Sequence, residues 1–230
     1  MVRWKRDHRL GETNGVEPPS GPGGGFDARW NRTPPGPGVV MEALFTSTAV
    51  VALAEIGDKT QLLAILLAAR FGRPLPIILG ILVATLANHA LAALLGAQAA
   101  ALLDSPLFRY AIGASFIAMA AWTLVPDTFD DDDDPKPRFG AFLTTLIAFF
   151  LVEMGDKTQV ATIALGAQYQ AVVAVTAGTT LGMMIANVPA VFLGNELLKR
   201  VDLARVRRIA AALFLVIGIW VLAQTAGWLR

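Results

Sequence analysis

The sequence contains no cysteine, only two histidines and few charged residues for its length, and each shortage excludes a class of site or protein. His8 and His89 cannot by themselves supply the Cys/His clusters that usually hold zinc or copper. Any metal ion bound by this chain must therefore be held by oxygen atoms. A formal net charge of +1, without a basic patch interleaved with aromatic residues, gives no indication of nucleic-acid binding.

Charged residues make up 16% of the 230 residues and hydrophobic residues 55%, with a mean hydropathy of +0.56. A soluble domain usually has about 25% charged residues, so this chain is too apolar to be one. Much of the charge lies in residues 1–40, 127–138 and 199–208, which leaves long apolar stretches between these segments. The composition predicts a protein embedded in a lipid bilayer.

Six apolar stretches are each near the ~20 residues that cross a bilayer as a helix, which predicts an all-α, polytopic membrane protein with six transmembrane helices. They lie at about 42–69, 75–98, 107–125, 139–168, 171–194 and 208–228. The connection between the fourth and fifth, around Gln168–Gln170, is very short. The first and fourth stretches exceed a minimal span, which is consistent with tilted, kinked or broken helices.

Residues 1–40 are rich in proline and glycine, show no apolar periodicity and lack the continuous apolar core of a signal peptide. We expect this segment to be a disordered extension. Its Lys and Arg residues also oppose the membrane orientation that the positive-inside rule predicts for the rest of the chain. We therefore expect translation to start at Met41.

One charged sequence occurs twice inside the apolar stretches, as EIGDKTQ at Glu55–Gln61 and as EMGDKTQ at Glu153–Gln159, 98 positions apart. A charge at bilayer depth costs roughly 2.5–3.5 kcal/mol even on the lenient insertion scale. Four carboxylates and two ammonium groups would then cost well over ~10 kcal/mol before any pairing. We interpret the doubled motif as the functional site.

The apolar part of the chain, about residues 41–230, consists of two halves that also resemble each other outside the motifs. At the same offset of 98, Gly80 and Gly96 correspond to Gly178 and Gly194, and Asn88 corresponds to Asn187 after a slip of one residue. With three helices in each half, the first helix of each half must cross the membrane in the opposite direction. This predicts two inverted three-helix repeats, residues 41–126 and 139–230, joined by an acidic cytoplasmic linker at 127–138, with the site at the midplane between them.

Four carboxylates are predicted to bind the cation and couple it to protons, and they are Glu55, Asp58, Glu153 and Asp156. Because residues three apart share one face of a helix, the two carboxylates of each motif should project together. The glycine between them would allow either close approach of a neighbouring helix or a local break that frees carbonyls as ligands. With no metal bound, the four carboxylates cannot all stay ionised, so one or two should hold protons that an arriving cation expels.

Lys59 and Lys157 could offset two of the four negative charges, and the remainder of about minus two suits one divalent cation. The predicted supporting groups nearby are those of Thr60, Gln61, Asn88, Thr158, Gln159 and Asn187. An all-oxygen site of this kind suits Mn²⁺, Ca²⁺ or Mg²⁺. The alternative is that each carboxylate simply pairs with a lysine and stabilises helix packing.

With these motifs, about residues 41–230 resemble the six-helix cation exchangers known as uncharacterised protein family 0016. Its members include bacterial manganese exporters and eukaryotic Golgi manganese/calcium–proton transport proteins. The family signature, Glu-x-Gly-Asp-Lys/Arg-Thr/Ser in two copies, is intact here. The resemblance implies divalent cation transport, with the four motif carboxylates at the cation site and Lys59, Thr60, Lys157 and Thr158 completing the signature.

We therefore expect a secondary active transporter, not an enzyme, that exchanges Mn²⁺ or Ca²⁺ for protons and exports manganese from the cytoplasm. The metal ion is its transported substrate, and no cofactor is implied. A passive divalent-cation channel is the alternative. A membrane-embedded protease or phosphatase is disfavoured, because the cytoplasmic loops offer no nucleophile–base pair or phosphate cradle. The compact form favours a prokaryotic plasma membrane, and the oligomeric state stays open.

Two further features have both a functional and a structural interpretation. Asp130–Asp134 is either a low-affinity cation collector or a solvated linker extended by its own repulsion. His89 either relays protons or contacts the ion, or it is a packed side chain hydrogen-bonded to a backbone carbonyl.

The positive-inside rule predicts a testable orientation. Most Lys and Arg residues of the body follow the first, third and fifth stretches, and they are Arg70, Arg73, Lys136, Arg138, Lys199, Arg200, Arg205, Arg207 and Arg208. These segments and the aspartate run should be cytoplasmic, with Met41 and Arg230 outside. Because the chain has no cysteine, Asp132→Cys should resist an impermeant thiol reagent added to intact cells, whereas Arg230→Cys should react. Labelling of Asp132→Cys from outside would contradict this orientation.

Overall fold

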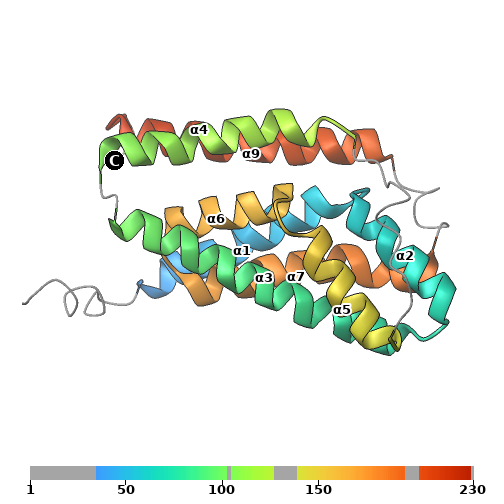
Figure 1. Ribbon diagram of the computed structural model, residues 1–230. Coiled ribbons are helices and arrows are strands. Elements are labelled where there is room, and N and C mark those ends of the chain that lie inside the picture. The colour runs from blue at the N-terminus through green and yellow to red at the C-terminus, as the bar shows by residue number, and fades with distance from the viewer. Residues whose placement is uncertain (1–34, 103–104, 127–138, 195–201, 229–230) are drawn as a thin grey trace, which may run out of the picture. The chain divides into compact units, whose positions relative to one another are not determined.

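A computed structural model describes residues 35–102, 105–126, 139–194 and 202–228, all of which belong to the unit Pro34–Arg230 (Figure 1). Within these ranges the chain forms helices joined by short connections and no β-strand, which confirms the predicted all-α class. The helices are α1 (Pro37–Glu55), α2 (Lys59–Phe71), α3 (Pro74–Leu102), α4 (Pro106–Thr123), α5 (Ala141–Val152), α6 (Lys157–Tyr169), α7 (Val172–Leu193) and α9 (Leu203–Thr225).

Several sequence-based expectations lie outside the described residues. They concern residues 1–34, the linker 127–138 with Asp130–Asp134, and the basic residues Lys199 and Arg200.

Each of the two motif-bearing stretches is a broken helix. The first divides into α1 and α2 and the fourth into α5 and α6, and both breaks fall within the charged motifs. α2 and α6 each contain 13 residues and begin at the same motif position, Lys59 and Lys157. In chain order, α1 to α4 therefore correspond to α5, α6, α7 and α9.

Four of the described helices, α1, α3, α7 and α9, are long and apolar enough to cross a bilayer, and α5 is a shorter apolar helix. Large apolar side chains such as Leu95 and Val216, each 62% exposed, lie on the outside of these helices. The motif carboxylates are buried instead. An apolar surface around a polar interior is what lipid requires, so this is a membrane protein. The number of six crossings and their inverted directions stay predictions.

Glycines let helices from the two halves approach closely, and one such contact occurs in both halves. A Cβ atom on Gly178 of α7 would lie 2.5 Å from the Leu44 carbonyl oxygen of α1. A Cβ atom on Gly80 of α3 would lie 2.8 Å from the Phe142 carbonyl oxygen of α5. The offset of 98 relates these contacts, so α7 packs on α1 as α3 packs on α5. Each half thus contributes a helix that packs against the first helix of the other half.

The second glycine pair is not equivalent in the structure. Gly96 lies inside α3 against the Ile163 backbone of α6, whereas Gly194 follows the end of α7 and has no neighbour within 4 Å of an added Cβ in the described part of the chain. α3 also packs much more extensively on α6 than α7 does on α2. The repeat is therefore approximate in three dimensions.

α1 begins earlier than expected, at Pro37, inside the segment 1–40 predicted to be disordered. Proline suits the first helical position, because its missing N–H would have no partner there. Residues 37–40 therefore belong to the membrane body.

The expected start of the last helix near residue 208 is wrong. α9 begins at Leu203, so the basic residues assigned to the preceding loop, Arg205, Arg207 and Arg208, lie in its first turns. Asp202 explains this start, because its carboxylate accepts a hydrogen bond from the Arg205 backbone N–H at 3.0 Å and pairs with the Arg205 guanidinium at 2.8 Å.

Gly178→Ala should destabilise the protein, because the added methyl group would press on the Leu44 carbonyl and force α1 and α7 apart. Overpacking of this kind costs about 1–3 kcal/mol. The measurement is the unfolding temperature of the purified protein in detergent. Gly38→Ala is the matched control, because Gly38 is also helical and no atom of the described residues lies within 4 Å of an added Cβ. Equal unfolding temperatures of the two variants would contradict the close contact.

Candidate functional site

Each motif breaks its helix at the glycine. Gly57 and Gly155 have φ angles of 83° and 81°, in the left-handed region that glycine enters without steric cost. The aspartates that follow are extended and occupy the N-cap position of the next helix, with φ and ψ of −80° and 166° at Asp58 and −79° and 169° at Asp156. The same short sequence therefore produces the same backbone path twice.

This break corrects the expectation that the two carboxylates of a motif share one face of a continuous helix. The helix ends between them, and a tight turn brings them together instead. In the first motif the Asp58 N–H donates to the Glu55 carbonyl at 3.0 Å, and in the second the Asp156 N–H donates to the Glu153 carbonyl at 3.3 Å. Of the two roles considered for the motif glycine, the structure shows the local break in both motifs, and at Gly57 it also shows a close neighbour, the Leu203 side chain of α9.

The threonine and glutamine of each motif stabilise the break. In the first motif the Gly57 N–H donates to Gln61 Oε1 at 2.9 Å, and the Thr60 hydroxyl donates to Glu55 Oε2. The second motif repeats both bonds, at 2.7 Å for the glycine–glutamine pair and 3.0 Å for the threonine–glutamate pair. The glutamine oxygens, predicted as nearby neutral oxygens, are thus engaged by the backbone.

The structure brings carboxylates of both motifs together in the protein interior. Glu55, Asp58 and Asp156 have oxygen atoms that all lie within 4.8 Å of one another, a spacing that one metal ion can bridge. Glu153 lies close enough to interact electrostatically with both Asp58 and Asp156. The four side chains are between 0% and 5% exposed. Their role as cation ligands stays a prediction.

One oxygen of each motif glutamate is left without a partner. Glu55 Oε1 and Glu153 Oε1 are buried and accept no hydrogen bond from the part of the chain that the structure describes. An ionised oxygen in this position is costly, whereas a proton or a bound cation removes the cost. The donor set, consisting of carboxylate oxygens, fits a hard divalent cation.

The motif lysines also belong to this cluster, and they act between the motifs. Lys157 Nζ lies 3.7 Å from Asp58 Oδ1, and Lys59 interacts electrostatically with Glu153. Sequence reasoning anticipated that lysine would offset carboxylate charge. It did not anticipate that Lys157 would form an ion pair with a carboxylate of the other motif.

Amides from α2 and α3 connect the site to the other half of the protein. Gln61 Nε2 donates to the Ala186 carbonyl of α7 at 2.9 Å, and Asn88 Nδ2 donates to the Phe150 carbonyl of α5 at 3.0 Å, one turn before the second motif. Asn187 instead donates within α7, and its buried Oδ1 accepts no hydrogen bond from the described residues. The contact between Gln61 and α7 has no sequence signal, because the acceptor is a backbone carbonyl.

His89 is buried in α3, and neither ring nitrogen has a hydrogen-bond partner among the described residues. The carbonyl bond expected for a purely structural histidine is therefore not found there. Proton relay by His89 stays a prediction.

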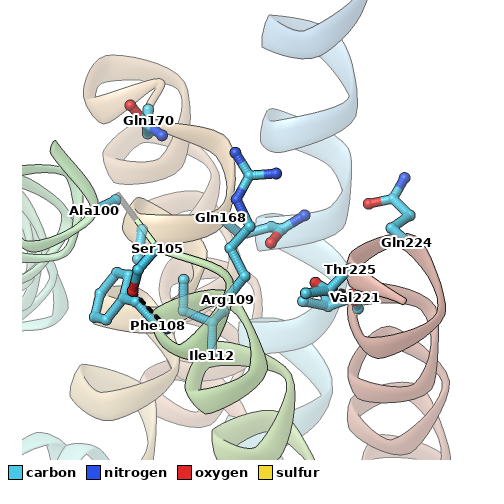
Figure 2. A pocket seen from close by; sticks show the side chains of 11 residues that line it. Ala100, Ser105, Phe108, Arg109, Ile112, Gln168, Gln170, Val221, Gln224 and Thr225 are labelled. Carbon is cyan, nitrogen blue, oxygen red and sulfur yellow. Dashed lines mark hydrogen bonds between the residues drawn. The ribbon is translucent and has the colours of Figure 1, made fainter. Parts of the chain in front are cut away.

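A separate cavity of about 170 Å³ lies between α3, α4, α6 and α9, about three turns along α6 from the second motif. Figure 2 shows the Arg109 side chain extending from α4 toward Gln168 of α6, with Gln224 and Thr225 of α9 on the opposite wall. The described residues that line this cavity include no motif carboxylate. It is distinct from the candidate cation site.

The sequence matches the family described as "Divalent cation/proton antiporter GDT1" over residues 43–131 and again over 141–228. The chain belongs to this family. The two matched segments each contain one copy of the motif, in agreement with the repeated helices. No solved structure matches the chain.

Among relatives of this GDT1-family protein, a Vibrio cholerae protein named "Putative manganese exporter" is 49% identical over 181 residues, which cover 78% of this chain and 90% of the relative. An Arabidopsis thaliana protein named "GDT1-like protein 5" is 28% identical over 220 residues, covering 79% of this chain and 96% of the relative. An Oryza sativa protein named "GDT1-like protein 3" is 28% identical over 206 residues, covering 78% of this chain and 73% of the relative.

Gln61→Leu should destabilise the protein more than Gln159→Leu, although the two glutamines occupy the same motif position. Both substitutions remove the acceptor of a glycine N–H, but only the first also removes the described bond to the Ala186 carbonyl. Losing the buried bond to the Ala186 carbonyl costs about 1–3 kcal/mol. Thermal unfolding in detergent measures the difference, and equal losses would show that the contact with α7 adds no stability.

Proposed function

We propose that this protein is a secondary active antiporter that exchanges Mn²⁺ or Ca²⁺ for protons at the paired motifs and exports manganese from the cytoplasm across the plasma membrane. Membership of the GDT1 family supports divalent cation transport, and the name of the Vibrio cholerae relative supports manganese. The observation that carries the proposal is the group of Glu55, Asp58 and Asp156, drawn from both motifs, with oxygens within 4.8 Å of one another.

Protons and the metal ion compete for the same oxygens in this proposal. With no ion bound, closely spaced buried carboxylates repel one another and cannot all remain ionised. Glu55 Oε1 and Glu153 Oε1 accept no hydrogen bond from the described residues, so a proton could be held at these two oxygens. An arriving divalent cation favours the ionised carboxylates and expels the protons. The site then alternates between a proton-loaded and a metal-loaded state, which is antiport.

Two inverted repeats would allow this site to open alternately to the two sides of the membrane. Each motif contributes a broken helix, a construction that transporters use to place backbone and side-chain ligands at the bilayer midplane. Glu55 and Glu153 would then approach the ion from opposite membrane faces. Both motifs would be indispensable, since neither supplies the whole cluster.

The main alternative, a passive channel, is disfavoured by membership of an antiporter family. A channel cannot move an ion against its gradient. Proton-driven accumulation of Mn²⁺ or Ca²⁺ in sealed vesicles therefore separates the two. Running the same assay with Mn²⁺, Ca²⁺ and Mg²⁺ identifies the transported ion.

Glu55→Gln and Glu153→Gln should each abolish proton-driven uphill movement of Mn²⁺ or Ca²⁺ in reconstituted vesicles. Glutamine keeps the shape of the side chain, and its carbonyl oxygen can still accept the threonine hydrogen bond. It can neither release a proton nor supply negative charge. The loss should therefore occur without loss of folding or membrane insertion.

Glu42→Gln provides the control, because it makes the same chemical change at another glutamate of α1. Glu42 is exposed and accepts a hydrogen bond from the Tyr169 hydroxyl. This variant should keep uphill transport. If either motif variant still drives uphill flux in a pH gradient, the proposed coupling is wrong.

A further inference from the structure

The two motif lysines occupy different environments although their motifs are nearly identical in sequence. Lys157 is 4% exposed and forms an ion pair with Asp58, whereas Lys59 is partly exposed and has no ion pair within 4.0 Å among the described residues. Burying an ammonium group is costly unless a carboxylate accompanies it. The deep position of Lys157 therefore reflects its attraction to the first motif's carboxylate.

The partner of Lys157 belongs to the candidate metal cluster. Asp58 shares the 4.8 Å group with Glu55 and Asp156, so the Lys157 ammonium lies at the edge of the space that a cation would enter. A divalent cation bound to Asp58 would repel an ammonium group 3.7 Å from the same carboxylate. The lysine and the ion cannot both have their most favourable contact with Asp58.

We propose that Lys157 is a positioning residue that serves as a tethered counter-cation. It pairs with Asp58 while the site holds no metal and withdraws from Asp58 when the divalent cation binds. This inference rests on the proposed function of the same site. Lys157 thereby lowers the affinity for the ion and keeps the metal-free cluster partly neutralised, so that the ion is released and the empty site remains stable.

The proposal is tested by measuring Mn²⁺ binding to the purified full chain in detergent with titration calorimetry. Lys157→Gln should bind Mn²⁺ at least about tenfold more tightly than the wild type, a change of ~1.4 kcal/mol. In vesicles the same variant should exchange Mn²⁺ more slowly, because the ion leaves more slowly. A merely structural role would instead weaken binding together with stability.

Lys59→Gln is the matched control, since it removes the same charge from the same motif position. Its gain in Mn²⁺ affinity should be clearly smaller, because Lys59 makes no described ion pair with a carboxylate of the cluster. Unchanged or weaker binding in Lys157→Gln, or an equal gain in both variants, would overturn the assignment of Lys157.

Lys157→Arg provides a second test that does not depend on the stability of the glutamine variant. Arginine keeps the charge and can hold a carboxylate with two hydrogen bonds, so it should compete more strongly for Asp58. We expect Mn²⁺ to bind a few-fold more weakly than to the wild type, and unchanged or tighter binding would contradict the proposal.

The wild type and Glu55→Gln distinguish this inference from the proposed function. If the wild type does not bind Mn²⁺, or if Glu55→Gln binds it equally well, the proposed cation site is wrong and the role of Lys157 is wrong with it. If the wild type binds Mn²⁺ and Glu55→Gln does not, the results for the two Lys157 variants decide the inference alone.

Discussion

The structure depends on the burial of several carboxylates in the interior of an apolar helix assembly. An isolated ionised carboxylate is too costly there, so it needs hydrogen bonds, opposite charge, protons or a bound cation. The motif provides the first two directly. Its threonine donates to the glutamate, and Lys157 from the second motif reaches Asp58 of the first. One glutamate oxygen in each motif is left for a proton or a cation.

The arrangement of the helices follows from bringing two such motifs together. Neither motif alone supplies the cluster of three carboxylates, which combines Glu55 and Asp58 with Asp156. α7 packs on α1 and α3 packs on α5 through glycines that leave no room for a side chain. These contacts let each half complete the other. Removing one half would therefore separate the carboxylates as well as expose apolar surface.

The two motifs are nearly alike in sequence but have different surroundings. A Cβ on Gly57 would lie 2.8 Å from the Leu203 side chain of α9, whereas none of the residues that the structure describes lies within 4 Å of a Cβ on Gly155. Lys157 is buried while Lys59 is partly exposed. Local backbone geometry is the same in both copies, so these differences come from the helices that pack around each break. The two motifs are therefore similar in sequence and backbone geometry but lie in different surroundings.

The sequence by itself determined the all-α class, the repeat of the motifs and the residues of the candidate site. These features follow from hydropathy, from the cost of charge in an apolar segment and from an offset that can be counted. The broken helix was one of three possibilities that hydropathy allowed, and the start of α9 was misplaced because a capping aspartate overrides a basic run. The tertiary structure decided which lysine is buried and which carboxylate it meets. It also decided that Gln61 bonds to the Ala186 carbonyl. Such contacts join residues far apart in the chain and often involve backbone atoms, which every residue has, so no local pattern in the sequence can specify them.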